Sequence, residues 1–288
     1  MFAGTYTAMV TPFDRNEAVD YEAFGRLIDA QFAAGVDGIV PVGTTGESPT
    51  LTMAEHVRVI EFSVERTAGR GKVIAGTGAN ATAEAVELTR HAQAAGADGS
   101  LQVTPYYNKP SQAGLIKHFE MLADIGLPLV LYNIPGRTSR ELTVDTVVTL
   151  AHHPHITTIK EAGGDVDRVS RYVDQCDIEI VSGDDSLTLP MMAVGAVGVI
   201  SVVANVVPDR VQAMVQAALQ GQWEAARQAH QALYPLFRDL FVETNPVPVK
   251  AALALLGRVE EVYRLPLHPL SEAQRAQVTN ALQRVGLL

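Results

Sequence analysis

Lys160 ends a run of apolar and β-branched residues, Ile156–Ile159, that is typical of a buried strand. Lysine side chains are rarely buried without a partner, so two interpretations are open. In the first, the ammonium group has just reached solvent. In the second, the amine is kept away from water, which lowers its pKa. A neutral amine of this kind is a nucleophile that forms a Schiff base with a ketone or an aldehyde.

Schiff-base chemistry also needs groups that move protons, because a carbinolamine must lose water and an enamine must be formed and quenched. Tyr132, in the segment LVLYNIP, can give and take a proton when a second hydroxyl is hydrogen-bonded to it. Thr44 is a candidate for that second hydroxyl. The alternatives are that Tyr132 packs in a core and that Thr44 caps a helix.

Two further segments carry groups that bind carboxylates. The segment VGTTGES (42–48) is a turn bracketed by glycines, and backbone N–H groups in such turns bind anions. The segment YNIPGRT (132–138) places Arg137 just beyond an expected strand, where a guanidinium group can bind a carboxylate through two parallel hydrogen bonds. An ordinary strand-to-helix turn and a surface arginine are the alternatives.

These residues need a scaffold, and the order of apolar and amphipathic segments predicts one. Helical patterns such as 21–35 and 82–96 end in glycine, as helices commonly do. Eight strand–helix units without a break in composition favour an α/β fold of the (β/α)8 barrel type over a doubly wound sheet. The expected strands are 5–10, 38–43, 73–78, 100–105, 129–135, 156–162, 178–183 and 198–205.

After the last expected strand the pattern becomes purely helical. We expect a barrel domain over 1–207 and a C-terminal helical extension over 208–288 that includes the last barrel helix. Active sites of such barrels lie at the C-terminal ends of the strands. Lys160 stands at such an end, in phase with Thr158 under the two-residue alternation of a strand, which favours the Schiff-base interpretation. Helices are expected near 208–219, 222–241, 247–256 and 271–285.

The composition limits the class of protein. The 288 residues are 47% hydrophobic and 19% charged, which permits a large core and disfavours disorder. The net charge of −10 argues against nucleic acid or an anionic membrane as a partner. The segment 187–208 has no charged residue and is long enough to span a bilayer. Prolines and glycines interrupt it, so we expect a short helix followed by a buried strand.

Cysteine usage and the N-terminus predict a cytoplasmic location. Cys176 is the only cysteine, so an internal disulfide is excluded and a reducing compartment is favoured. The first residues lack the basic and long apolar regions of a signal peptide.

No metal site is expected. Neither a zinc-binding Cys/His pattern nor a dinucleotide-binding fingerprint is present. His152, His153 and His155 precede an expected strand, at the end of the barrel away from the site, and we expect them in solvent. Asp184 and Asp185 are expected in a turn or at a helix start.

Motifs spread along the whole chain resemble the 4-hydroxy-tetrahydrodipicolinate synthase family, also called dihydrodipicolinate synthase. The motifs GTTGE and the strand lysine mark only the broader superfamily of class I pyruvate-dependent aldolases and lyases. The motif TPYYN together with the arginine of YNIPGRT is more specific, since sialic acid lyases typically lack that arginine. The matching segments are GTTGES, AGTGANATAEA, TPYYNKPSQ, YNIPGRT, IKEA, SGDD, GVISVVAN and NPVPVK.

The resemblance implies a homotetrameric TIM barrel that condenses pyruvate with L-aspartate 4-semialdehyde, the first committed step toward diaminopimelate and lysine. It implies no cofactor, because the imine is formed by the protein itself. Lys160 would form that imine with pyruvate. Tyr132, Thr44 and Tyr107 would form a proton relay, with Tyr107 reaching in from a neighbouring subunit.

The resemblance also implies five substrate-binding positions. Thr44 and Thr45 would hold the pyruvate carboxylate, and Arg137 would hold the carboxylate of the semialdehyde. Gly183 and Ile200 would line the pyruvate pocket, Ile200 through its backbone.

In lysine-sensitive relatives the end product binds in a cleft between subunits. Glu84 would bind the α-ammonium group of L-lysine, and Asn80 and Tyr106 its carboxylate. We expect partial, millimolar inhibition by L-lysine; the alternative is that these residues only pack at an interface. The matching positions are Ser48, His56, Asn80, Glu84 and Tyr106, with departures at Pro49, where a smaller residue is common, and Met53, where a histidine is common.

Two other functions stay open at this point. One is another Schiff-base enzyme on the same scaffold, such as a 2-keto-3-deoxy-sugar-acid aldolase or N-acetylneuraminate lyase, against which Arg137 and Tyr107 count. The other is a catalytically silent pyruvate-binding relative, against which the complete proton relay counts.

Overall fold

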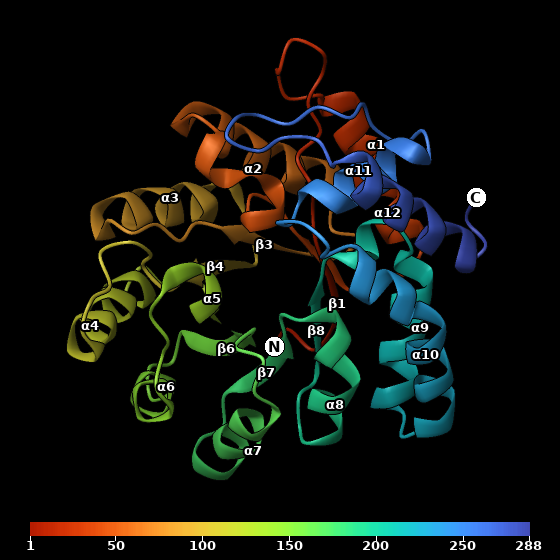
Figure 1. The fold of residues 1–288 in the computed structure, drawn as a ribbon. Coiled ribbons are helices and arrows are strands. Elements are labelled where there is room, and N and C mark those ends of the chain that lie inside the picture. The colour runs from red at the N-terminus through yellow and green to blue at the C-terminus, as the bar shows by residue number, and fades with distance from the viewer.

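Eight parallel strands close into a barrel in the order in which they occur in the sequence. Figure 1 shows this barrel at the centre of the molecule. The computed structural model describes all residues, Met1–Leu288. The first strand pairs in parallel with both the second and the last, which closes the sheet. The predicted (β/α)8 barrel is therefore confirmed. The strands are β1 Gly4–Ala8, β2 Gly38–Val40, β3 Lys72–Gly76, β4 Gly99–Val103, β5 Leu129–Asn133, β6 Ile156–Glu161, β7 Glu179–Ser182 and β8 Gly198–Ser201.

A ring of helices surrounds the barrel (Figure 1). Capping residues fix where some of these helices begin, and α2 is an example. The Thr52 side chain accepts a hydrogen bond from the backbone N–H of Glu55, and the Glu55 carboxylate accepts one from the backbone N–H of Thr52. The helices between strands are α1 Tyr21–Ala33, α2 Met53–Thr67, α3 Thr82–Ala95, α4 Gln112–Ala123, α5 Pro135–Thr138, α6 Val144–Ala151, α7 Val166–Gln175 and α8 Thr188–Ala193. Short 3-10 helices are η1 Thr44–Gly46, η2 Ser48–Thr50, η3 Asp185–Leu187 and η4 Val203–Asn205.

The chain ends in the helices that the sequence predicts after β8. Helix α9 packs on β1 and on α10, and the two helices lie side by side in Figure 1. The uncharged segment 187–208 contains the expected short helix, α8, and the expected strand, β8, but the strand ends at Ser201 and η4 follows it. No helix of the structure combines the length and the apolar composition that crossing a bilayer needs. The C-terminal helices are α9 Pro208–Leu219, α10 Trp223–Asp239, α11 Val247–Leu255 and α12 Glu272–Arg284.

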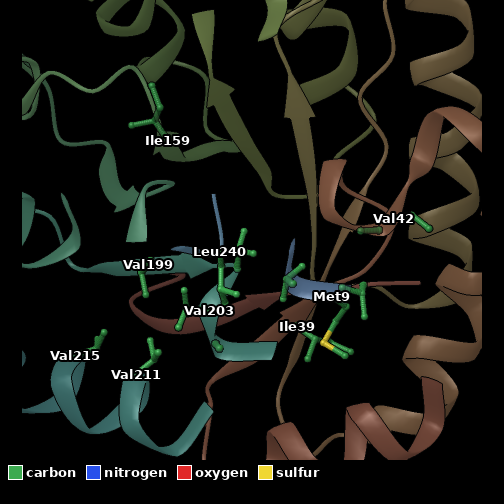
Figure 2. Close-up of a cluster of buried hydrophobic side chains, with 14 of the residues drawn as sticks. Met9, Ile39, Val42, Ile159, Val199, Val203, Val211, Val215 and Leu240 are labelled. Carbon is green, nitrogen blue, oxygen red and sulfur yellow. The ribbon is translucent and has the colours of Figure 1, made fainter. Parts of the chain in front are cut away.

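The strands divide their apolar side chains between two cores, because successive residues of a strand point to opposite faces. The larger core lies between the sheet and the helices. Figure 2 shows part of it, where Val199 of β8 lies near Val211 and Val215 of α9. The smaller core fills the barrel. It consists of Phe2, Tyr6, Ala8, Val40, Ile74, Leu101, Val130, Tyr132, Val181 and Ile200.

The N-terminus closes the bottom of the barrel. The Phe2 side chain is buried in the barrel core, and the amino group of Met1 forms an ion pair with Glu179 at the start of β7. The Lys72 ammonium donates to the Met1 carbonyl at 2.6 Å and lies over the Phe2 ring. With the bottom filled, the interior is reached from the C-terminal ends of the strands.

Candidate active site

A cavity of about 370 Å³ lies at the C-terminal ends of the barrel strands. Its walls come from the loops after β2, β5 and β7, from β5 and β6 themselves, and from the C-terminal helical region. Chemistry-bearing residues far apart in the sequence meet here. The sequence-predicted residues that line it are Thr44, Thr45, Tyr132, Arg137, Lys160 and Gly183.

Lys160 reaches this cavity because it occupies an inward position of β6. Its neighbours in register are Tyr132 on β5 and Val181 on β7, both members of the barrel core. The side chain is buried, and its Nζ lies 4.2 Å from the centroid of the Tyr132 ring. The other buried lysine, Lys250, has a carboxylate partner, whereas Lys160 has none.

Burial changes the acid–base chemistry of Lys160. Removal from water lowers the pKa of the amine to about 8, with Asp185 opposing this and Arg137 adding to it. At pH 7, about a tenth of the amine is then neutral, far more than for a lysine in water. The neutral amine is the form that attacks a carbonyl carbon.

Asp185 is a buried carboxyl whose charge acts on Lys160, and burial raises its own pKa to about 6. Its carboxylate accepts from Ser201 Oγ at 2.5 Å and from the backbone N–H groups of Val202 and Val203. These bonds join the start of η3, where Asp185 stands, to the junction of β8 and η4. Asp184 accepts from Ser186 at the start of η3. Both aspartates occupy the turn and helix-start positions that the sequence predicts.

No three histidine, cysteine or carboxylate side chains gather where they could hold a metal ion. His152 is exposed, and His153 lies 3.2 Å from the exposed Asp124 at the opposite end of the barrel from the cavity.

The Tyr132 hydroxyl stays protonated at neutral pH. Burial raises the pKa of its hydroxyl to about 12, and Arg137 and the hydrogen-bonding Thr44 hydroxyl partly oppose the rise. Thr44 stands at the start of η1, where the first N–H groups of a helix lack partners within it. The pair therefore places a protonated phenol and an adjacent hydroxyl beside the amine of Lys160.

Gly183 leaves room for the lysine. A Cβ atom at this position would lie 2.8 Å from Lys160 Cε and 2.8 Å from Ala162 Cβ. Any side chain here would displace the amine from its position in the cavity. The glycine of the SGDD segment is thus explained by close packing and not by an unusual backbone angle.

Arg137 lies in the short helix α5 at the rim of the cavity, and Asn245 holds it there. The Arg137 guanidinium donates to the Asn245 carbonyl at 3.0 Å, and the Asn245 amide donates to Thr45 Oγ1 at 2.9 Å. Sequence reasoning did not identify Asn245 as a site residue, although it stands in the NPVPVK motif. Phe237 and Phe241 of the C-terminal region also line the cavity without having been predicted.

Two predicted site residues lie elsewhere in this chain. Tyr107 is 89% exposed, has a left-handed backbone with φ of +71°, and does not reach the cavity of its own chain. Ile200 is buried in the barrel core below the cavity, while Val202, two residues later, lines it.

A second cavity of about 180 Å³ lies between α2, α3 and the η2 turn. Asn80 does not line it, but its amide donates to the Tyr106 carbonyl at 3.2 Å. His56 Nε2 lies 2.7 Å from the Gly76 carbonyl, and burial lowers the pKa of His56, so the neutral imidazole donates here. Of the residues predicted for L-lysine, Ser48, Pro49, His56, Glu84 and Tyr106 line this cavity, as does Met53.

A third cavity of about 190 Å³ lies between the other two. It shares Thr44, Tyr132 and Arg137 with the first cavity, and Ser48, Pro49 and Tyr106 with the second. The first and second cavities are therefore linked through a third cavity whose lining residues belong to both.

Comparisons with known proteins match essentially the whole chain, and all of them give the same family. The model of the dihydrodipicolinate synthetase family matches residues 1–285. The 4-hydroxy-tetrahydrodipicolinate synthase of Aquifex aeolicus (strain VF5) is 51% identical, with 100% of this chain and 99% of that protein covered. A crystal structure of dihydrodipicolinate synthase from Aquifex aeolicus superposes with a TM-score of 0.98 at 50% identity, covering 99% of each chain.

Two further solved structures contain ligands. The chloride-inhibited dihydrodipicolinate synthase of Acinetobacter baumannii, complexed with pyruvate, is 42% identical with a TM-score of 0.98, and the match covers 100% of both chains. The lysine-bound enzyme of Cyanidioschyzon merolae is 40% identical with a TM-score of 0.96, and the match covers 100% of this chain and 99% of that one. The family model and these relatives cover the barrel and the C-terminal helices together, and the chain belongs to the dihydrodipicolinate synthetase family.

Proposed function

We propose that Lys160 is the residue through which this chain condenses pyruvate with L-aspartate 4-semialdehyde to 4-hydroxy-tetrahydrodipicolinate, the lyase reaction of its family. The observation that carries the assignment is a buried lysine without a carboxylate partner, 4.2 Å from the ring of Tyr132 at the mouth of a barrel. The experiment that tests it is reduction with borohydride in the presence of pyruvate, which should leave a reduced pyruvyl group on Lys160.

The reaction follows from these groups in four steps. The neutral Lys160 amine attacks the C2 carbonyl of pyruvate, and the Tyr132 hydroxyl protonates the departing oxygen as water leaves. The Tyr132 phenolate takes a C3 proton from the imine to give an enamine. The enamine C3 attacks the aldehyde carbon of the semialdehyde, and Tyr132 protonates the aldehyde oxygen. The substrate amino group then attacks C2 and releases the Lys160 amine. One water molecule is lost overall, and no external oxidant or reductant is needed.

The η1 turn supplies the groups for the pyruvate carboxylate. Thr44 and Thr45 are the first two residues of this turn, whose leading N–H groups have no partner within the turn and favour an anion. Both residues line the cavity that Lys160 enters. We assign the pyruvate carboxylate to them, which leaves Arg137, at the rim, for the carboxylate of the semialdehyde.

Removal of Arg137 is expected to affect one substrate more than the other. In the Arg137→Ala variant, the KM for the semialdehyde should rise by roughly 10- to 150-fold, because a charged hydrogen bond contributes roughly 1.5–3 kcal/mol. The KM for pyruvate should change little. Steady-state kinetics with each substrate varied in turn measures both, with Arg171→Ala, an exposed arginine of α7, as the control. Equal effects on both substrates would assign Arg137 to holding α5 in place.

We further propose that L-lysine binds in the second cavity and inhibits the enzyme partially. Support comes from the gathering of Glu84, His56 and Tyr106 around one space, and from the lysine-bound relative. Glu84 would bind the α-ammonium group, while Asn80 and Tyr106 would bind the carboxylate. A dissociation constant in the millimolar range corresponds to about 4 kcal/mol of binding free energy.

The Glu84→Ala variant is expected to lose this inhibition while its kcat stays near the wild-type value, because Glu84 does not line the Lys160 cavity. The measurement is the rate with increasing L-lysine at saturating and at sub-saturating pyruvate. Glu87→Ala, on the same helix but outside the second cavity, is the matched control. Wild-type activity that stays constant in excess L-lysine at both pyruvate levels would refute the site.

Three broader expectations belong to the same proposal. Tyr107 enters the cavity of a neighbouring subunit as the third member of the relay, in agreement with its exposed position. The assembly is a homotetramer built as a dimer of dimers. The enzyme acts in the cytoplasm without a bound cofactor, where Cys176 stays a free thiol.

A further inference from the structure

A buried ion pair joins the end of the η1 turn to helix α11. Lys250 Nζ lies 2.5 Å from Glu47 Oε1, and both side chains are completely buried. The ammonium group also lies over two aromatic rings, 4.3 Å from the centroid of Phe13 and 5.3 Å from that of Tyr263. None of these residues lines the cavity that contains Lys160.

Stability alone is a weak explanation for such a pair. Removing two charges from water costs about as much free energy as their attraction returns. Apolar residues of similar volume often give a folded protein the same or greater stability. A buried pair does, however, fix its two partners in one geometry. The geometry that this pair fixes is the backbone immediately after Thr44, Thr45 and Gly46.

Glu47 has a backbone conformation that needs such a restraint. Its φ of 55° and ψ of 35° lie in the left-handed region, which costs a residue with a side chain on the order of 1 kcal/mol or more. This conformation ends η1 and starts η2 at Ser48. The second carboxylate oxygen accepts from the backbone N–H of Arg264 at 3.3 Å, so the Glu47 side chain is held from two directions.

A second tether to the same turn comes from the residues before α11. The Asn245 amide donates to Thr45 Oγ1. Since that oxygen accepts from Asn245, the Thr45 hydroxyl proton remains free to donate to an anion in the cavity. Asn245 and Lys250 thus bind Thr45 and Glu47, two positions of one short turn, from one segment of the chain.

We propose that Lys250 is a positioning residue for the reaction: through Glu47 it holds the η1 turn so that Thr44 and Thr45 present their N–H and O–H groups to the pyruvate carboxylate. The inference rests on the proposed function. It predicts that loss of the pair weakens pyruvate binding, because a displacement of about 1 Å in groups that orient a substrate can cost up to 100-fold in rate.

The test measures how much pyruvate is needed to form the Lys160 adduct. Wild-type enzyme is treated with borohydride over a range of pyruvate concentrations, and the adduct is quantified by mass spectrometry. The Lys250→Met variant keeps an unbranched side chain that is one atom shorter and removes its charge. Its half-saturating pyruvate concentration should rise on the order of tenfold or more. Asp239→Asn, which alters another buried carboxylate with an arginine partner on α10, should leave that concentration unchanged.

The double variant Lys250→Met/Glu47→Gln separates positioning from stability. It leaves no unpaired buried charge, so its thermal midpoint should recover toward the wild-type value relative to Lys250→Met. Its half-saturating pyruvate concentration should nevertheless stay raised, because the tether is still absent. If Lys250→Met does not fold, this double variant carries the test.

The outcomes are distinct. A folded Lys250→Met or double variant with wild-type half-saturation overturns the inference, as does an equal rise in Asp239→Asn. A wild-type enzyme that forms no adduct at Lys160 overturns the proposed function itself, and this inference with it.

Discussion

Replacement of Lys160 by alanine is expected to abolish both the pyruvyl adduct and nearly all activity. In the wild type, pyruvate with borohydride should add a reduced pyruvyl group to this one residue, because the neutral amine attacks the ketone and the imine is then reduced. Lys160 is the only lysine that lines the cavity, so no neighbouring side chain can replace its amine. Peptide mapping by mass spectrometry locates the adduct, and a coupled assay with both substrates measures the activity.

The lowered pKa of Lys160 adds a pH signature to this experiment. Below a pKa of about 8 the neutral fraction rises roughly tenfold for each pH unit, so the rate of adduct formation should rise up to about pH 8 and then level off. Lys117→Ala, an exposed lysine of α4, is the control and should label like the wild type. An adduct that persists in Lys160→Ala would show that the imine forms elsewhere.

Replacement of Tyr132 by phenylalanine is expected to lower kcat by roughly 100-fold or more, the usual effect of losing a general acid–base group. The ring stays packed in the barrel core, so folding and the position of Lys160 should be unchanged. The phenol is protonated at neutral pH, since burial raises its pKa to about 12. The Tyr132→Phe variant therefore loses a neutral hydroxyl that can donate a proton, and it does not lose a negative charge.

Steady-state kcat is the measurement, and Tyr234→Phe, an exposed tyrosine of α10, is the control. Tyr107→Phe should lower kcat in the same direction but less. If Tyr132→Phe and Thr44→Val both keep the wild-type kcat, the two hydroxyls do not form a relay.

The sequence predicted the number and order of the strands, but several predicted strands run past their observed ends. Residues 38–43 were expected in one strand, whereas β2 ends at Val40, and Val42 has a left-handed backbone with φ of +50°. Residues 198–205 were expected in another, whereas β8 ends at Ser201 and η4 follows. Most residues beyond these ends are apolar and buried, and apolarity does not distinguish a strand from a turn buried beneath helices.

The site was predictable where the signal was local. The inward position of Lys160 follows from the two-residue alternation of one strand, and Gly183 and Arg137 follow strand ends. Asn245 and Lys250 could not be identified in this way, because each contacts a residue about 200 positions earlier in the chain. Contacts over such separations depend on how the barrel closes, which no local pattern encodes. The expected division into 1–207 and 208–288 stays a prediction.

The exposed position of Tyr107 has a consequence for how the enzyme responds to dilution. The side chain projects into solvent from a left-handed residue, so a chain on its own presents a cavity with two relay hydroxyls and not three. If the third is supplied by another copy, turnover per chain obeys mass action, as binding to any partner does. The rate per chain then falls once the protein concentration drops below the dissociation constant of that contact, and the abundance of the protein in the cell becomes a determinant of its specific activity.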